Sequence, residues 1–183
     1  LAGMFLTDLS AQCIEGDCWN GNGTAVYKSG AKYVGSFREG KIHGFGTLYF
    51  SKGDIYVGEW NNHYRQGKGE IAFANGNHYQ GNFKKSRIKG TGTMKYNNGD
   101  QYSGNWDNDL PSGKGQYLFT SGAKYKGNFE KGKFEGLGIM YYADGGRFEG
   151  NWKENKKHGE GIFFSSEGKK EVGKWVNGSI KID

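Results

Sequence analysis

The protein has 183 residues, a formal net charge of +6 and a sequence pI of about 9.1, with 34 glycines and one proline. So much glycine without proline excludes collagen and argues against a disordered linker. The 12 tyrosines, 12 phenylalanines and 5 tryptophans exclude low-complexity disorder, because that much aromatic surface packs against something. No apolar run approaches the ~20 residues of a membrane-spanning helix.

The first segment, residues 1–18, lies outside any repeated pattern and contains both cysteines, Cys13 and Cys18. The short spacing lets the two thiols meet across a tight turn. We expect a disulfide that fixes an N-terminal cap and contributes about 2 kcal/mol to stability; two unpaired thiols are the alternative. A disulfide favours an extracytoplasmic compartment, periplasmic or secreted, over a cytoplasmic or peripheral-membrane one. The start of the chain at Leu1 is too short for a recognisable signal peptide, although residues before it could have formed one.

From residue 19 to residue 178 the sequence repeats seven times with a period of 23 residues and no insertion. A fixed period of this length is typical of proteins built from tandem copies of one supersecondary unit. One series of glycines that marks the period is Gly35, Gly58, Gly81, Gly104, Gly127, Gly150 and Gly173. A second series begins a Gly-x-Gly motif in every copy: Gly21, Gly44, Gly67, Gly90, Gly113, Gly136 and Gly159.

Each copy contains two alternating segments. The first has an aromatic residue, a glycine and a second aromatic at every other position, as in Tyr56, Gly58 and Trp60. A period of two predicts a β-strand with these residues on one face. A polar connection, expected to span six residues such as 38–43 or 84–89, leads to the Gly-x-Gly motif and a second alternating strand. A glycine-containing turn then starts the next copy, so each copy is expected to be an antiparallel β-hairpin without a helix.

This pattern resembles the MORN (membrane occupation and recognition nexus) repeat, in which Tyr-x-Gly-x-Trp precedes a short connection, His-Gly-x-Gly and an aromatic strand. Residues 56–60 match the first part, and residues 43–46 and 158–161 match the second. The resemblance covers almost all of the chain after residue 18, and it extends to bacterial exported MORN proteins, which often carry a cysteine pair before the first copy. It implies an all-β fold, an elongated single-layer antiparallel sheet of about seven hairpins that forms an open groove.

For function, the resemblance implies a non-enzymatic binding or scaffolding protein whose groove or exposed end receives a protein or peptide partner. The sheet also needs the same rings for its own packing, so a purely structural role is the competing interpretation of each one. The residues expected in the partner-binding groove are Tyr56, Trp60, Tyr79, Phe83, Tyr102, Trp106, Tyr125, Phe129 and Trp152.

Two other surfaces are candidates. Basic residues in two connections favour an alternative function, peripheral binding of acidic phospholipids, to which MORN proteins are often linked; each basic group near such a surface contributes about 1 kcal/mol. Simple solvation of these charges is the competing interpretation. The expected lipid contacts are Lys84, Lys85, Arg87, Lys89, Lys153, Lys156 and Lys157. The polar face of the first strand carries four successive asparagines, which suit either a polar ligand or solvent: Asn82, Asn105, Asn128 and Asn151.

Catalytic, cofactor and metal sites are not expected. Each Gly-x-Gly leads into a strand and not into the N-terminus of a helix, which argues against a phosphate loop. His43 and His158 share one repeat position, and neither His63 nor His78 has a cysteine or carboxylate at metal-ligand spacing. The modest charge and the lack of a binding motif argue against a nucleic-acid partner.

The repeat pattern decays at its C-terminal end. Glu171 and Ser165 stand at positions where other copies have aromatic residues, and residues 179–183 alternate as a last strand or tail. An uncovered terminal strand attracts pairing, so these changes predict either a cap or a homodimer contact through the terminal repeat.

Overall fold

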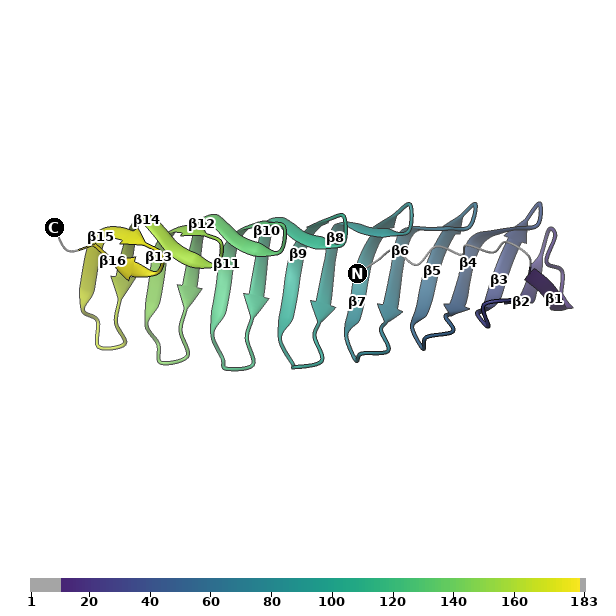
Figure 1. The fold of residues 1–183 in the computed structure, drawn as a ribbon, viewed down its shortest axis with the longest axis horizontal. Coiled ribbons are helices and arrows are strands. Elements are labelled where there is room, and N and C mark those ends of the chain that lie inside the picture. The colour runs from purple at the N-terminus through teal and green to yellow at the C-terminus, as the bar shows by residue number, and fades with distance from the viewer. Residues whose placement is uncertain (1–10, 182–183) are drawn as a thin grey trace. The chain divides into compact units, whose positions relative to one another are not determined.

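The computed structural model describes residues 11–181 and forms two compact units, Leu1–Asn97 and Asn98–Asp183. Within each unit the strands follow one another in chain order, each antiparallel to its neighbour (Figure 1). The strands of the first unit are β1 (Ala11–Gly16), β2 (Asn22–Tyr27), β3 (Lys32–Arg38), β4 (Lys41–Tyr49), β5 (Ile55–Asn61), β6 (Tyr64–Ala72), β7 (His78–Lys84) and β8 (Arg87–Lys95). Those of the second are β9 (Gln101–Asp107), β10 (Leu110–Leu118), β11 (Lys124–Glu130), β12 (Lys133–Tyr141), β13 (Arg147–Lys153), β14 (Lys156–Phe164), β15 (Lys170–Val176) and β16 (Ser179–Ile180). The predicted all-β architecture of antiparallel hairpins is confirmed.

No helix in the described part of the chain is long and apolar enough to cross a membrane.

The turn inside each hairpin is shorter than the sequence suggested. Only Glu39 and Gly40 connect β3 to β4, with φ angles of 50° and 69°. Two consecutive positive φ angles define a type I′ turn, whose twist matches that of the flanking strands. The same turn joins β7 to β8 through Lys85 and Ser86, with φ angles of 48° and 64°. The predicted six-residue connection is therefore wrong, because its outer residues already pair across the two strands.

The turn between hairpins has three residues. Phe50 donates its N–H to Asp54 O (2.9 Å), and Gly53 donates to Phe50 O (3.0 Å) with a φ of 92°. A glycine in this conformation closes the common three-residue hairpin loop. The Asp54 side chain then accepts the N–H of Ala74 in the next turn at 2.9 Å. Successive turns are thus joined by side-chain hydrogen bonds as well as by the strands.

The buried face of each sheet is built by tyrosine rings that lie on glycines. Tyr56 has no exposed surface, and its hydroxyl donates to Glu59 O at 3.0 Å. A Cβ atom on Gly69 would lie 2.4 Å from the Tyr56 hydroxyl oxygen. Only glycine admits the ring here, and the area that the ring removes from water, at about 25 cal/mol per Å2, offsets the low strand propensity of glycine. We call this side of each sheet the aromatic face, and the opposite side the outer face.

Neighbouring hairpins are joined through edge-to-face ring contacts. The Tyr56 ring lies 5.0 Å from Trp60 in its own strand and 5.0 Å from Phe83 in the next hairpin, both with the planes 85° apart. Tyr125 makes the same two contacts, 5.3 Å to Phe129 and 5.3 Å to Trp152. Such geometry adds about 0.5–1.5 kcal/mol per pair beyond simple burial. The core is therefore a continuous series of rings within each unit.

Asp100 joins its own turn to the next one, as Asp54 does in the first unit. Its carboxylate accepts hydrogen bonds from Thr120 N (2.9 Å) and Tyr117 Oη (2.8 Å) and is 8% exposed. The Thr120 N–H, before any other group, lowers the pKa of Asp100 below its ordinary value of 3.8. Because the folded pKa is the lower one, the ionised carboxylate stabilises the fold above the unfolded pKa, and this contribution is lost as pH falls through the folded pKa.

We therefore expect Asp100→Asn to lower the free energy of unfolding by about 1–2 kcal/mol at pH 7 and by almost nothing in strong acid. Urea denaturation from pH 7 downward measures both. Asp144→Asn is the control, because that carboxylate accepts from Gly146 within its own turn. A deficit for Asp100→Asn that stays constant down to strong acid would contradict the assignment to charge.

Candidate binding surfaces

The nine aromatic side chains expected in a binding groove all lie on the aromatic face, where they are core. The four tyrosines have no exposed surface, and none of the nine exceeds 5%: Tyr56 0%, Trp60 4%, Tyr79 0%, Phe83 3%, Tyr102 0%, Trp106 4%, Tyr125 0%, Phe129 4% and Trp152 5%. Trp60 and Trp152 also use their indole N–H groups internally, donating to Gly46 O at 3.2 Å and Gly138 O at 3.1 Å. Packing accounts for these residues, and their contact with a partner stays a prediction.

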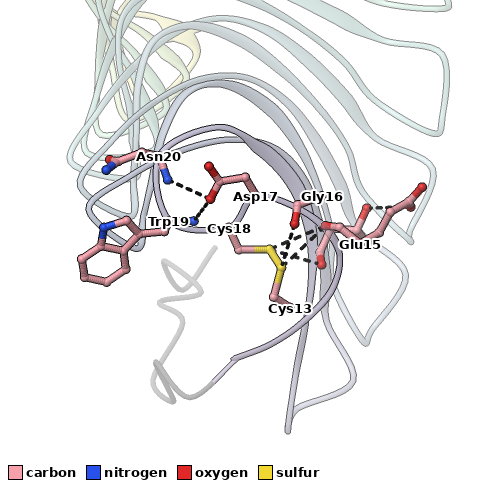
Figure 2. The surroundings of a disulfide bond; sticks show 8 residues. Cys13, Glu15, Gly16, Asp17, Cys18, Trp19 and Asn20 are labelled. Atoms are coloured by element: carbon pink, nitrogen blue, oxygen red, sulfur yellow. Dashed lines mark hydrogen bonds between the residues drawn. A yellow bond between two sulfur atoms is a disulfide. The ribbon is translucent and has the colours of Figure 1, made fainter.

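Strand β1 and the turn after it, residues 11–20, form a disulfide-closed cap that pairs with β2 in the first unit. A disulfide joins Cys13 in β1 to Cys18, with the two Cα atoms 5.9 Å apart, as expected from the sequence. Figure 2 shows how Asp17 holds the turn that follows, accepting the N–H groups of Trp19 (2.8 Å) and Asn20 (3.1 Å) on one carboxylate oxygen. These two N–H groups lower the pKa of Asp17. The cap therefore fixes the backbone at Trp19.

The disulfide takes the place of a tyrosine ring. A Cβ atom on Gly23 would lie 2.7 Å from Cys18 Sγ, whereas one on Gly46, the next glycine in that series, would meet the Tyr33 ring. At the other end, in the second unit, Ile180 of β16 covers Gly173 in the same way, with its Cδ1 2.6 Å from a Cβ placed there. Each end of the repeat array thus has a side chain that substitutes for the missing ring.

An open pocket of about 480 Å3 lies beside the cap in the first unit. Its size is within the range of small-ligand and peptide side-chain pockets. Trp19, 65% exposed, is its most accessible large side chain. The pocket is lined by Ala11, Cys13, Gly16, Asp17, Cys18, Trp19, Ala25, Tyr27, Phe37, Gly40 and His63. Burial lowers the pKa of His63, with Lys41 adding to the effect, and burial raises the pKa of Tyr27 to about 12, so both are neutral at pH 7.

The basic residues of the first cluster share the outer face. Lys84 of β7 is paired with Arg87 of β8, Lys89 follows two residues later, and Lys85 occupies the turn. All four are exposed. The structure therefore brings this predicted cluster together, and binding of acidic lipid to it stays a prediction.

The second basic cluster is divided between the two faces. Lys153 and Lys156 are paired on the outer face at the β13–β14 turn, whereas Lys157 is opposite Trp152 on the aromatic face. Its ammonium lies 4.6 Å from the centre of the Trp175 ring. The expectation that all three lysines lie in one exposed connection is therefore wrong for Lys157, because its position in β14 faces the aromatic side while Lys153 and Lys156 face outward.

The asparagine positions on the outer face hold the backbone of the next strand. The two strands of each hairpin from β3–β4 to β13–β14 form a bulge at this position. In the hairpin of β3 and β4, residues 43–45 of β4 lie opposite the single residue Ser36 of β3, and Gly44 adopts a φ of 71°. Asn82 donates to Thr91 O at 2.9 Å, Asn151 donates to Glu160 O at 3.3 Å, and Glu59 accepts from Lys68 N at 2.9 Å. For these side chains the structure shows a role in supporting a bulge.

The 23-residue repeat unit relates this chain to known proteins. The sequence profile of the MORN repeat matches six consecutive copies, residues 33–55, 56–78, 79–101, 102–124, 125–147 and 148–170. The chain belongs to the MORN-repeat family. The predicted seventh MORN copy is divided between the ends of the array: β2 is the second strand of a hairpin and β15 is the first strand of another.

Two solved structures resemble the MORN array. The TCP domain of SAS-4 (dCPAP) from Drosophila melanogaster, solved with a proline-rich motif of Ana2 (dSTIL), aligns with a TM-score of 0.53 and 16% identity over 88% of each chain. The TCP10 domain of Danio rerio CPAP aligns with a TM-score of 0.29 and 12% identity over 91% of this chain and 96% of that one. The first of these shows a shared fold. A comparison with curated proteins found no match.

Trp19 and His63 line the pocket but were not predicted as site residues. Trp19 precedes Ile42 by one period of 23, but it lies in the turn before β2, whereas Ile42 lies in β4. Within residues 11–181 no complete hairpin precedes Trp19, and its ring lies against Gly40, where a Cβ atom would be 2.9 Å away. The 23-residue period could have indicated this, because an aromatic residue at a repeat position near the end of the array is expected to have an accessible ring.

The cap disulfide gives a direct prediction for stability. Reduction should lower the free energy of unfolding by about 2 kcal/mol, the chain-entropy value for a loop this small, and should increase amide exchange in β1 first. Hydrogen-exchange mass spectrometry of oxidised and reduced protein measures the second effect. The Cys13→Ala, Cys18→Ala protein is the control and should match the reduced form under both conditions. Complete alkylation of both thiols in the untreated native protein would contradict the disulfide.

Proposed function

We propose that this MORN-repeat protein is a non-enzymatic scaffold that binds an extended peptide segment of a partner protein at the pocket beside the N-terminal cap. The observation that supports this most directly is the exposed Trp19 ring at the rim of an aromatic pocket of about 480 Å3. Tryptophan is enriched among residues that dominate binding energy, particularly where its ring borders a pocket. The remaining rings of the aromatic face are already used by the core.

Rigidity favours the same assignment. The disulfide and the Asp17 hydrogen bonds hold Trp19 before any ligand arrives. A preorganised site loses less conformational entropy on binding and therefore binds more tightly for the same contact area. Tyr27 and His63 in the pocket lining carry no charge at pH 7. Asp17, which also lines the pocket, is ionised, and its carboxylate is held by two backbone N–H groups. A largely apolar peptide segment suits these surroundings better than an acidic one.

The fold likeness suggests which peptides to test first. The Drosophila domain was solved with a proline-rich motif, and proline-rich segments generally dock between aromatic side chains in an extended conformation. We include an extended, proline-containing peptide in the proposal on that basis.

Selection from a displayed peptide library, half of it proline-containing, tests the proposal. Peptides that bind the wild-type protein are expected to bind Trp19→Ala about 30-fold more weakly, as a central tryptophan typically contributes about 2 kcal/mol. Phe45→Ala is the matched control, because Phe45 is 61% exposed on β4, away from the pocket, and should bind normally. Calorimetry measures both affinities. Failure to select any peptide, or equal loss in both variants, would refute the pocket as the site.

A further inference from the structure

Lys157, which the proposed function does not use, lies among aromatic rings. Its ammonium is enclosed by four rings of the second unit, at 4.6–5.2 Å from each ring centre. The four rings belong to Tyr142, Phe148, Phe163 and Trp175. A cation over ring faces is attracted by their π electrons, but these contacts supply no hydrogen-bond acceptor in the ordinary sense.

The same repeat position in the first unit shows what Lys157 lacks. Arg65 lies over the rings of Phe50, Tyr56 and Phe83 and also donates to Ser86 O at 2.5 Å. In the second unit, the residue equivalent to Ser86 is Gly178, which donates its N–H to Lys157 O at 2.9 Å. Within the described residues, the shorter, single-headed Lys157 side chain makes no contact like the one between the Arg65 guanidinium and Ser86 O. Over residues 11–181, the Lys157 ammonium has no hydrogen-bond or ion-pair partner, although it is only partly exposed. Partial burial removes some water from this ammonium, and the ring contacts offset part of that cost, so an acceptor that reaches the ammonium would stabilise it further.

The charged groups nearby limit what that acceptor can be. Burial lowers the pKa of Lys157, and attraction to Glu171 partly opposes this effect. Glu171 stands where other copies have a tyrosine, and its carboxylate is paired with Lys169 at 3.1 Å. A single ammonium can neutralise one negative charge, and Glu171 opposes every anion, more strongly the more charge that anion carries. A phosphate, with a charge of about −1.5 to −2 at pH 7, would be repelled by Glu171 and only partly neutralised.

We propose that Lys157 and the rings around it form a carboxylate-binding site that takes an acidic side chain of a peptide, next to an apolar or aromatic residue. The ammonium donates charge-assisted hydrogen bonds to the carboxylate. The buried rings of Phe148 and Trp175 exclude water from that pair, and the partly exposed rings of Tyr142 and Phe163 contact the neighbouring apolar group. This site lies wholly in the second unit and does not depend on the pocket at Trp19.

Two blocked dipeptides test the site. N-acetyl-Phe-Glu-amide and N-acetyl-Phe-Gln-amide differ only in charge and are titrated against the full chain, with NMR signals of the Lys157 side chain and the Trp175 indole as readouts. The Glu peptide is expected to bind at least tenfold more tightly, as about 1.4 kcal/mol of charge-assisted bonding implies. Its saturation should raise the pKa of Lys157.

Three variants and one small anion complete the test. Lys157→Met keeps the aliphatic stem and should remove the preference for Glu, whereas Lys156→Met, on the outer face, should keep it. Glu171→Gln should strengthen binding of the Glu peptide. Equal binding of the two peptides to the wild type, or an unchanged preference in a Lys157→Met protein with a normal melting curve, would overturn the proposal. Acetate binding as tightly as the Glu peptide would overturn the assignment to a peptide.

Discussion

Gly69→Ala is expected to destabilise the first unit by about 3 kcal/mol or more. The three atoms nearest to the new Cβ, at 2.4–2.7 Å, all belong to the Tyr56 side chain. That ring has no exposed surface and is in edge-to-face contact with Trp60 and Phe83, so it cannot move aside without breaking both contacts. Overpacking of this kind typically costs 1–3 kcal/mol and sometimes more. The smaller gain from replacing a flexible glycine, about 0.5–1 kcal/mol, does not offset it.

A double-mutant cycle separates this clash from a general effect of alanine in the strand. In a Tyr56→Ala background the ring is absent, and Gly69→Ala should then have almost no cost. The coupling free energy, measured by urea denaturation of the four proteins, should be about 3 kcal/mol and favourable. If the two destabilisations simply add, the ring is not what requires glycine at this position.

Trp152→Ala is expected to have a similarly large effect in the second unit. The Trp152 ring contacts Tyr125 at 5.3 Å and Phe148 at 5.4 Å, and its N–H donates to Gly138 O at 3.1 Å. Truncation removes the ring, leaves a cavity and leaves the carbonyl without that donor, for a total of about 3–5 kcal/mol. For a unit of this size, each kcal/mol shifts the midpoint of melting by about 4–8 °C.

We therefore expect a fall in Tm of at least about 12 °C for the transition of the second unit. Leu137→Ala is the control, because Leu137 belongs to the same unit and is 65% exposed, and its Tm should change by a few degrees at most. Calorimetry together with hydrogen exchange shows which unit has lost stability. Equal Tm changes in the two variants would mean that the ring contacts contribute little.

The strands were predictable because one face of each must be aromatic. An aromatic residue, a glycine and a second aromatic alternate in the first strand of every hairpin from β3 to β13, as in Tyr56, Gly58 and Trp60, so period two is visible in the sequence alone. The turns were less predictable. Lys84 and Arg87 are polar because they lie on the outer face, and polar residues at the end of a strand look the same as residues of a loop. Lys85 and Ser86 adopt positive φ angles without the glycine or asparagine that usually signals a type I′ turn.

The candidate sites depended on facts that periodicity does not contain. Trp19 and Ile42 occupy the same position in the period, but within residues 11–181 no complete hairpin precedes Trp19. Trp19 is therefore 65% exposed, whereas Ile42 is buried. Lys157 looked like one more lysine beside Lys156, and the register of β14 with β13 places the two on opposite faces. The face on which a residue lies and its distance from the end of the array therefore distinguish the candidate sites, whereas the period predicts only the fold.

The order of the strands also determines how each unit would respond to mechanical tension. Antiparallel hydrogen bonds run perpendicular to the strands, so a force applied along the succession of hairpins loads the strand pairs in series and opens the weakest pair first. In the second unit that pair is β15 with β16, which share only two register positions, Trp175 with Ile180 and Val176 with Ser179. Its release would uncover Gly173, so the unit would peel from that end, hairpin by hairpin, and extend without a single high-force rupture.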